Sequence, residues 1–280
     1  MKRTLILAIS VLMLFSFAAC SRPVDAPPQE GGVQEDDKKV TLVVLDDKLS
    51  PEEYGIGFRK EDTALAAAIG NTLLDMKEDG TLAEISKEWF GKENTTISGD
   101  KVEAEPILMD KLVMGVDDSF PPMGFRDSSG EIVGFDISLA TEVAKRLDVE
   151  LVIQPIDWAV KEQELATKKI DVIWNGYTIT DARREMVLFS QPYMSNNQVA
   201  VVNSADGYKT LDDLAGKKVG VQSGSSTMDA IEANEAFSSS IELVEFKENT
   251  VALLDLEKGG LDAVVLDEVV ANYYISEKSK

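Results

Sequence analysis

Apolar strand-like segments alternate with amphipathic helical segments from residue 111 onward, and this alternation restricts the fold more than any other feature. The stretches KLVMGV, ELVIQPI and DVIWNGYTI are separated by predicted helices over residues 136–147 and 157–169, each with its first residue, an aspartate, as N-cap. Continuous apolar runs are typical of parallel strands whose sheet is covered on both faces. The pattern therefore predicts an α/β unit with a mainly parallel sheet.

The same pattern starts again after Gly216. KKVGVQ, IELVEF and DAVVLD are predicted strands, and residues 226–237 and the stretch NTVALLDLEKGG are predicted helices. Two such runs predict two α/β lobes. The stretch NNQVAVVNS, between them, is a predicted strand that crosses from one lobe to the other.

An N-terminal block adds the strand-like VTLVVLDD and a predicted helix from about residue 63 to 79. GTLAEISKEWFG then predicts a second helix, in which Thr81 and Glu84 form a capping box and Gly91 ends the helix. This segment resembles the last element of a fold, although it lies in the first third of the chain.

The N-terminus predicts a secretory leader. A basic start is followed by an apolar stretch over residues 5–19, which is short for a membrane span. FAAC, which contains the only cysteine, resembles the lipobox of bacterial lipoproteins and implies cleavage before Cys20 and lipidation of Cys20. We therefore predict a lipoprotein signal peptide over residues 1–20 and a flexible, Pro- and Gly-containing tether over residues 21–38. The alternative is an ordinary signal peptide with an incidental cysteine.

Charge and missing residue types exclude several functions. The formal net charge of −22 argues against nucleic acid and anionic lipid as partners. The chain has no histidine, which excludes Ser-His-Asp and Cys-His catalysis and zinc sites built on imidazole. VGVQSGSS lacks both the Walker lysine and the GxGxxG spacing, and no calcium-loop pattern occurs. We expect a binding protein without cofactor or metal rather than an enzyme.

Ligands of parallel α/β sheets bind beyond the carboxyl ends of the strands, where this chain has the groups that a zwitterion needs. Arg183 can clamp a carboxylate, and the amides around Ser226 and Thr227, at a helix start, can add donors. Asp267 can accept from an α-ammonium, together with Thr178. Taken singly, Arg183 could instead make a surface ion pair and Asp267 could cap the next helix.

Phe120 and Trp158 also follow predicted strands and could sandwich the aliphatic part of a ligand or stack on a cation. A core position is the alternative for both aromatic residues. The backbone near Asn175 and Gly176 lies at the end of another predicted strand and could share the ammonium with Thr178.

Four motifs resemble the polar amino-acid binding proteins of ABC importers, the group with glutamine, histidine and lysine/arginine/ornithine receptors. The motifs are LVMGVDDSFPPMGFRDSSGEIVGFDISLATEVAKRL, KIDVIWNGYTITDARREMVLFSQPYM, LDDLAGKKVGVQSGSS and GGLDAVVLDEVVANYYI. The resemblance implies a two-lobed, hinge-connected periplasmic-binding-protein fold of type II. It implies one ligand site: Arg183, Ser226 and Thr227 for the α-carboxylate, Asp267 with Asn175 or Gly176 and Thr178 for the α-amine, Phe120 and Trp158 as aromatic clamp, and Asp117 and Gln222 toward the ligand side chain.

The chain order departs from that family. The segment from VVLDDKLS to KEWFGK resembles the family's C-terminus, but here it precedes KLVMGVDD. We therefore predict a circular permutation, with residues 93–110 joining the former ends through a polar surface loop. Lobe 1 is then continuous over residues 53–202, and lobe 2 combines residues 39–52 with 203–280.

The resemblance implies a lipid-anchored monomer on the extracytoplasmic face of the bacterial membrane that captures an L-amino acid and delivers it to an ABC permease. The lobes would close about hinges at residues 196–204 and about 49–54. Asp117 and Gln222 suit an amide or a cation, and we favour glutamine narrowly over arginine or lysine. Two alternatives are a receptor that presents its ligand to a sensor and a prephenate-type dehydratase on the same fold, in which Asp117 would act as the acid.

Overall fold

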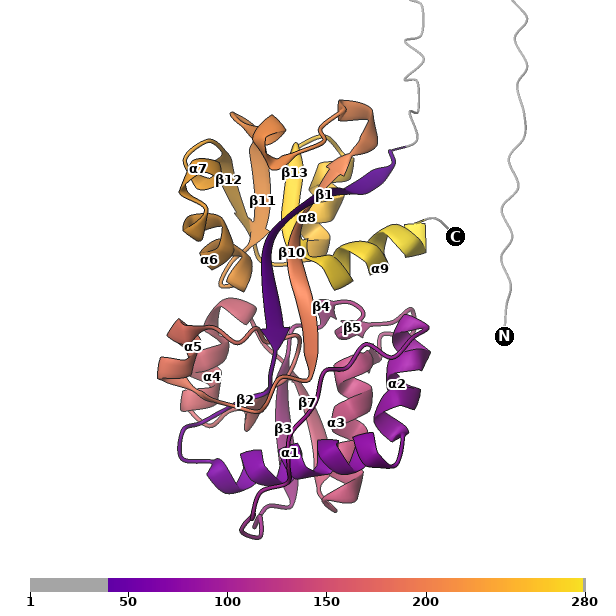
Figure 1. Cartoon of the computed structure of the whole chain (residues 1–280), viewed down its shortest axis with the longest axis vertical. Coiled ribbons are helices and arrows are strands. Elements are labelled where there is room, and N and C mark those ends of the chain that lie inside the picture. Colours follow the sequence, from indigo (N-terminus) through magenta and orange to yellow (C-terminus); the bar gives the residue numbers. More distant parts are fainter. Residues whose placement is uncertain (1–39, 279–280) are drawn as a thin grey trace, which may run out of the picture. The chain divides into compact units, whose positions relative to one another are not determined.

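The computed structural model describes residues 40–278, which form two five-stranded sheets with helices around each, and a small third sheet (Figure 1). The predicted signal peptide, Cys20 and the predicted tether lie outside these residues. Within residues 40–278, no helix has both the length and the apolar character needed to cross a bilayer.

The first sheet belongs to what we call the first lobe. β3 is parallel to β7 and β8, whereas β2 pairs antiparallel with β8 and β9. In sheet order the strands are β7 (Glu150–Pro155), β3 (Lys111–Val116), β8 (Val172–Ile173), β2 (Gly57–Phe58) and β9 (Leu188–Phe189). A small antiparallel sheet beside it contains β4 (Ser119–Phe120), β5 (Gly124–Arg126) and β6 (Ile132–Val133).

The second sheet belongs to the second lobe and is mixed. β11 is parallel to β12 and β13, and β10 pairs antiparallel with β13 and with β1. In sheet order the strands are β1 (Leu42–Tyr54), β10 (Met194–Asn203), β13 (Ala263–Asp267), β11 (Lys218–Gln222) and β12 (Glu242–Phe246). The early segment of the chain therefore shares a sheet with later segments and does not form a sheet of its own.

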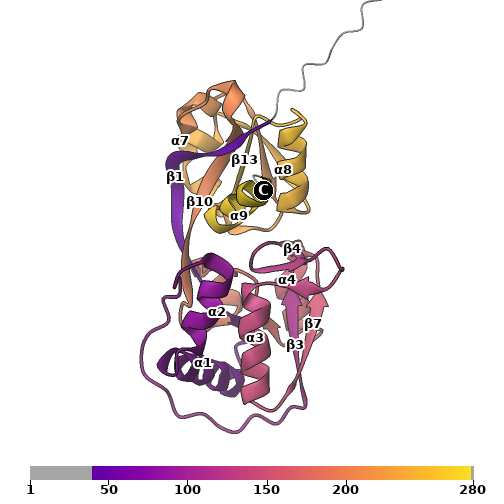
Figure 2. The same cartoon turned by 90° about the vertical axis from the view of Figure 1, so that its right-hand side faces the viewer.

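The two longest strands, β1 and β10, run side by side from the second lobe into the first, and we call them the connecting strands (Figures 1 and 2). Val199 and Val201 in β10 are fully buried, so the strand is held by the core of the second lobe. The predicted crossing strand over residues 196–204 is thus β10, which begins two residues earlier, toward the first lobe, and ends one residue earlier.

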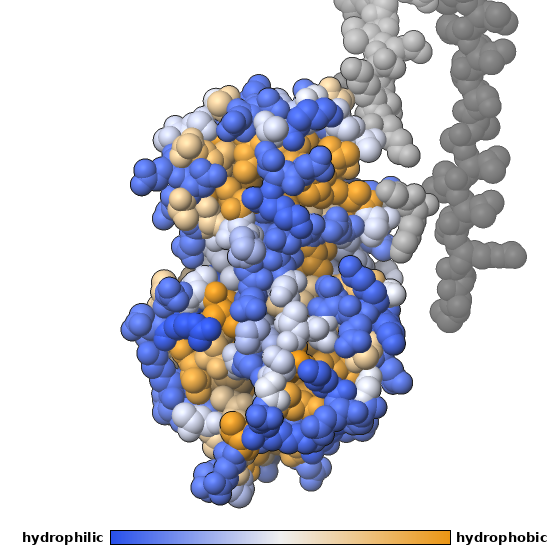
Figure 3. Space-filling model, viewed as in Figure 1, coloured by the Kyte–Doolittle hydropathy of each residue, from blue (hydrophilic) through white to orange (hydrophobic). Residues whose placement is uncertain are grey.

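Helices cover both sheets at about the predicted places. The first lobe has α1 (Thr63–Glu78), α2 (Thr81–Phe90), α3 (Phe135–Arg146), α4 (Lys161–Ala166), α5 (Asp181–Met186) and the 3₁₀ turn η1 (Trp158–Val160). The second lobe has α6 (Ser226–Ala233), α7 (Glu235–Ser238), α8 (Asn249–Glu257), α9 (Glu268–Lys278) and the 3₁₀ turns η2 (Ser204–Asp206) and η3 (Leu211–Leu214). Hydrophilic residues cover most of the face shown in Figure 3, as expected from the excess of acidic residues.

The helix that resembles a last element, α2, packs on the first lobe. Trp89 donates its indole N–H to the Ser138 hydroxyl on α3 at 3.0 Å. Gly91 ends α2 in the left-handed conformation, as predicted. The predicted capping box is wrong, because the N-cap is Gly80 and the Asp79 carboxylate accepts from both the backbone N–H and the hydroxyl of Thr81.

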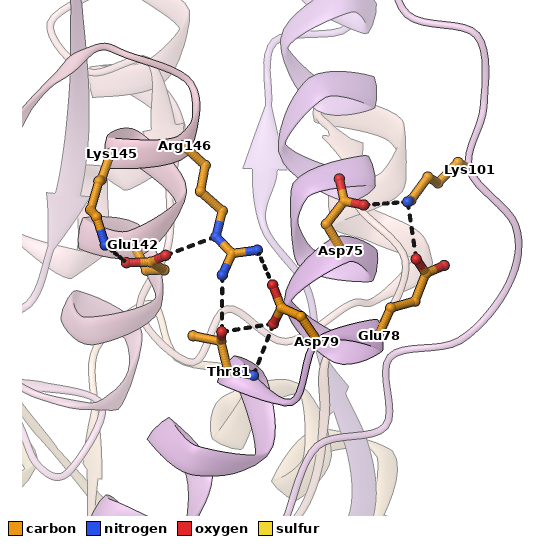
Figure 4. Close-up of polar contacts among 8 residues, drawn as sticks. All are labelled: Asp75, Glu78, Asp79, Thr81, Lys101, Glu142, Lys145 and Arg146. Atoms are coloured by element: carbon orange, nitrogen blue, oxygen red, sulfur yellow. Dashed lines mark hydrogen bonds and ion pairs between the residues drawn. The ribbon is translucent and has the colours of Figure 1, made fainter.

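The same Asp79 carboxylate ties α2 to α3 (Figure 4). Arg146 at the end of α3 donates to Asp79 at 2.7 Å and to the Thr81 hydroxyl at 2.9 Å. These bonds, led by the one from Arg146, lower the pKa of Asp79 to about 2. The hydrogen bonds at the start of α2 are therefore made by the carboxylate of Asp79, which precedes the helix, and not by a capping box of Thr81 and Glu84.

The predicted N-cap Asp136 is also wrong. Gly134 occupies the N-cap of α3, and Asp136 lies inside the first turn with its side chain fully buried. The carboxylate accepts from the Gly176 N–H and the Tyr193 hydroxyl, both at 2.8 Å. Burial raises the pKa of Asp136 to about 7 although these hydrogen bonds oppose the rise. The carboxylate therefore fixes a loop of the first lobe instead of capping a helix.

Three predicted elements are interrupted or shorter than expected. The helix over residues 157–169 is split into η1 and α4, although Asp157 does cap it by accepting from the Ala159 N–H. The helix over residues 226–237 breaks at Asn234, whose side chain caps α7. The strand DVIWNGYTI is regular only at β8, because the backbone turns left-handed at Gly176 (φ +57°) and leaves the sheet there.

Candidate functional site

A small cavity lies between the two lobes and encloses about 10 Å³, enough for about one water molecule. Its walls come from the ends of β4, β11 and β13, from η1, α5 and α6, and from the chain after β8. The lining residues are Phe120, Trp158, Gly176, Thr178, Arg183, Gln222, Ser225, Ser226 and Asp267. Eight of these nine belong to the eleven residues predicted for the ligand site, and Ser225 is the addition.

Arg183 enters the cavity from the first turn of α5. The Thr180 hydroxyl caps this helix by accepting from the Arg183 N–H at 3.1 Å, which sets the direction of the side chain. The guanidinium is buried and donates to the Thr178 carbonyl at 2.9 Å and, across the lobes, to the Gly224 carbonyl at 3.4 Å. Its Cζ lies 4.7 Å from the centre of the Tyr177 ring. The Glu162 carboxylate lies 4.0 Å from the Arg183 Nε. A buried guanidinium whose closest acceptors are two neutral carbonyls is suited to clamp a carboxylate.

Asp267 faces the cavity from the opposite lobe, at the end of β13. It is 4% exposed and accepts from the Tyr54 hydroxyl and from Asn196 Nδ2 at 3.1 Å. Burial is the main cause that raises the pKa of Asp267 well above its usual value, and the nearby carboxylate of Glu52 is the second. The site therefore carries a cation from one lobe and a carboxyl group from the other.

Hydroxyl groups at the two lobes meet beside this carboxyl group. Thr178, after β8, and Ser226, at the start of α6, have their hydroxyl oxygens 2.9 Å apart. Thr227, which was predicted for the site, lies behind it, because its hydroxyl donates to Gln198 Oε1 at 2.7 Å. Thr227 is 1% exposed and does not line the cavity.

Asp117 and Gln222 form a polar contact across the lobes. Gln222 Nε2 donates to Asp117 Oδ2 at 2.6 Å, and Gln222 Oε1 accepts from Asn249 Nδ2 at 2.9 Å. Burial raises the pKa of Asp117, although its bonds from Ser119 and Gln222 lower it. Neither Asp117 nor Asn175 lines the cavity itself. The side chain of Asn175 accepts from the Asp117 N–H at 2.8 Å and so holds the backbone that follows β3.

The two predicted clamp aromatics lie at the cavity and are both nearly buried. A Cβ on Gly176 would lie 2.7 Å from Phe120, so only glycine allows this aromatic ring so near the backbone. Trp158 packs edge-on to Tyr177, with ring centres 5.9 Å apart. The sequence left open whether Phe120 and Trp158 form a ligand clamp or belong to the core. In the structure both rings are packed in the protein and also line the cavity.

Sequence reasoning missed Lys161, which bridges the lobes. Its ammonium is almost fully buried and donates to the Gly224 carbonyl at 2.8 Å and to the Trp158 carbonyl at 3.1 Å. It also lies 3.2 Å from Glu162. Burial, followed by the charge of Arg183, lowers the pKa of Lys161 to about 8. A lysine near the start of a short helix has no sequence signal that separates it from a surface residue.

Glu52 on β1 was missed as well. Its carboxylate accepts from Thr178, Ser226, Asn196 and Gln198, so it lies directly behind the hydroxyl groups of the cavity. The alternation of side chains along β1 could have placed it on the same face as Tyr54, had the pairing with β10 been known. As for metals, the described part of the chain contains no cluster of three or more histidine, cysteine, aspartate or glutamate side chains able to hold an ion.

Two α/β lobes joined by two strands, with a cation and a carboxyl group facing one interlobe cavity, define a two-lobed ligand-binding protein. The chain belongs to the bacterial extracellular solute-binding proteins, family 3, whose model matches residues 17–92 and 112–274. The predicted family is confirmed.

Individual relatives agree with this assignment. The L-cystine-binding protein TcyJ of Escherichia coli is 33% identical over 162 residues, which are 57% of this chain and 60% of TcyJ. The lysine/arginine/ornithine-binding periplasmic protein of the same organism is 35% identical, over 59% of this chain and 64% of its own length. The alignments thus span less than two thirds of these relatives. Both are named as binding proteins and not as enzymes, in agreement with the prediction.

A solved structure shows the same fold. It is an ABC uptake transporter substrate-binding protein from Streptococcus pneumoniae with bound histidine, with a TM-score of 0.60 and 41% identity. The superposition covers 61% of this chain and 71% of that protein.

Proposed function

We propose that this protein captures a polar L-amino acid between its two lobes and delivers it to an ABC importer. The observation that carries the proposal is the pairing of Arg183 and Asp267, which face one cavity from opposite lobes. Such a pair matches the α-carboxylate and the α-ammonium of an amino acid. The names of the relatives, which bind cystine, histidine or basic amino acids, support the same class of ligand.

Capture would proceed by closure of the lobes around the ligand. A ligand that contacts groups from both lobes stabilises the closed state by those extra contacts. Several contacts already join the lobes here, among them Gln222 to Asp117, Lys161 and Arg183 to the Gly224 carbonyl, and Thr178 to Ser226. We propose that the connecting strands act as the hinge, with the ligand-binding residues on either side of it.

For the ligand side chain we propose glutamine ahead of arginine and lysine. Asp117 can accept from an amide or a cation, and the amide of Gln222 can donate to a carbonyl oxygen of the ligand. A glutamine side chain placed between Asp117 and Gln222 would replace the bond between them: its amide N–H would donate to Asp117, and its amide oxygen would accept from Gln222. An arginine or lysine would leave the Gln222 amide donor unmatched.

A thermal-shift screen of the twenty amino acids tests the proposal. Binding to the folded state raises the apparent stability by mass action, by about 2.7 kcal/mol at a ligand concentration one hundred times Kd. We expect L-glutamine to raise Tm most, followed by L-arginine and L-lysine. A response to leucine alone would overturn the assignment of a polar ligand, and no response to any amino acid would overturn the function.

We further propose that Cys20 is lipidated and anchors the protein on the extracytoplasmic face of the membrane. FAAC ends an apolar leader-like stretch, and several relatives are named as periplasmic. Mass spectrometry of the protein purified from membranes of the bacterium that produces it should find Cys20 at the mature N-terminus and carrying acyl chains. A Cys20→Ala variant should leave the membrane fraction, and retention there would contradict the anchor.

The predicted lobe boundaries and the circular permutation are also proposals. The two segments that match the family model are separated by residues 93–111, which include the whole of the predicted joining loop. In a permuted chain two segments occur in the opposite order from the relatives. A single alignment in sequence order can include only one of these segments, which would account for the partial coverage of the relatives. A chain re-ordered to begin at Lys111 and to join Tyr274 to Val40 should fold and bind as the native chain does. Failure to fold would count against the permutation.

A further inference from the structure

One carboxylate, that of Glu52, contacts both lobes and the connecting strands. Glu52 Oε2 accepts from the hydroxyls of Thr178, at 2.8 Å, and Ser226, at 3.1 Å. Glu52 Oε1 accepts from the side-chain amides of Asn196, at 2.5 Å, and Gln198, at 2.9 Å. Since Thr178 belongs to the first lobe and Ser226 to the second, this set of bonds is complete only when the lobes are together.

Strand register explains why Glu52 lies beside Asp267. Glu52 pairs with Asn196 across β1 and β10, and Gln198 pairs with Asp267 across β10 and β13. Paired residues share a face of the sheet, and so do residues two apart on one strand. All four side chains therefore lie on one face. Asn196 Nδ2, which donates to Glu52, also donates to Asp267 Oδ1 at 3.1 Å, so one amide nitrogen contacts both carboxyl groups.

The charged and titratable groups around this pair are few. Tyr54, on the same face of β1, donates its hydroxyl to Asp267, and burial raises the pKa of this phenol. Arg183 lines the same cavity, but its guanidinium donates to the carbonyls of Thr178 and Gly224. The protein therefore supplies neutral hydroxyl and amide donors to both carboxyl groups. A cation arriving in the cavity would complete the balance of charge.

We propose that Glu52 is a positioning residue of the α-ammonium subsite. It holds the hydroxyls of Thr178 and Ser226 in place as the lobes close, and it adds a second negative charge beside Asp267. Because Thr178 donates its one hydroxyl proton to Glu52, and Ser226 can occupy at most one lone pair of the Thr178 oxygen, a lone pair remains to accept from an ammonium. This role rests on the proposed capture of an amino acid.

The role has a pH signature. Asp267 must be ionised to hold an ammonium, and its pKa is raised by burial and by the charge of Glu52. Ligand affinity should therefore be high above that pKa and fall as the pH drops through it. Removing the charge of Glu52 lowers the pKa of Asp267, so the fall should move to more acidic pH.

Titration calorimetry of the full chain with L-glutamine and with L-arginine, over a range of pH, tests the proposal. In Glu52→Gln we expect the fall in affinity to move down by about one pH unit or more, because a like charge has been removed. At pH values above the range in which affinity falls, Glu52→Gln should bind about tenfold more weakly than the wild type, because the hydrogen bonds to a charged carboxylate are lost. Glu53→Gln is the matched control, since it removes the same charge from the next residue of β1, whose side chain is exposed.

The outcomes are distinct. Glu52→Gln with the affinity and pH profile of the wild type overturns the role of Glu52 and leaves the proposed function intact. A wild type that binds none of the twenty amino acids overturns both. Should Glu52→Gln not fold, Glu52→Asp decides, because it keeps the charge and shortens the reach. The proposal then requires weaker binding with an unmoved pH profile, and wild-type affinity in Glu52→Asp overturns it.

Discussion

Replacing Arg183 by alanine is expected to weaken amino-acid binding by about 2–5 kcal/mol, or about 30- to 4,000-fold in Kd. The guanidinium is the buried cation of the cavity, and the proposed ligand carboxylate would lose its charged partner. Titration calorimetry with L-glutamine and L-arginine measures the change, and thermal unfolding checks that the variant is folded.

Arg184 provides the control for this substitution. It is the next residue of α5, carries the same charge and is exposed, with its guanidinium 5.8 Å from the Phe189 ring. Arg184→Ala should therefore bind as the wild type does. Equal affinities of both alanine variants would remove Arg183 from the carboxylate site and, with it, the main support for the proposed function.

Replacing Gly224 by alanine is expected to impair closure of the lobes. A Cβ at this position would lie 2.8 Å from the Cα of Ala159 in the other lobe, nearer than real Cβ contacts allow. Forcing backbone apart in this way costs about 1–3 kcal/mol, which corresponds to about 5- to 150-fold weaker binding. Calorimetry measures the affinity, and small-angle X-ray scattering with ligand should show a less compact protein than the wild type.

Gly216→Ala separates this steric effect from backbone strain. Gly216 has φ +74° and Gly224 has φ +71°, so alanine is strained to a similar degree at both. A Cβ at Gly216 would have no atom of the described residues within 4 Å, and both glycines belong to the second lobe. Both variants should lose similar stability, but only Gly224→Ala should lose affinity. A similar loss of affinity in both would exclude the lobe contact as the cause.

Periodicity predicted most elements of the fold from local sequence. The helix expected over residues 63–79 is α1, and KLVMGV is β3 without any change of bounds. Prediction succeeded here because each segment buries one face or is buried throughout, and this leaves a pattern within the segment itself.

Local capping patterns were less reliable. Asp136 and Thr81 both have the residue type of an N-cap, yet a glycine takes that position in each case. The carboxylates near these helices bond instead to residues far away in the sequence: Asp136 accepts from Tyr193, and Asp79 accepts from Arg146. A hydrogen bond to a residue far along the chain leaves no pattern in the local sequence.

The sequence by itself determined the succession of strands and helices, and the residues at the ends of the parallel strands pointed to the candidate site. Only the tertiary structure decided which other residues join them. Glu52 and Asp267 meet because β10 pairs with both β1 and β13, strands that lie at opposite ends of the chain. Lys161 reaches the site only because the two lobes approach at Gly224. Strand pairing and lobe contact depend on the fold as a whole, whereas strand ends follow from local hydrophobic patterns.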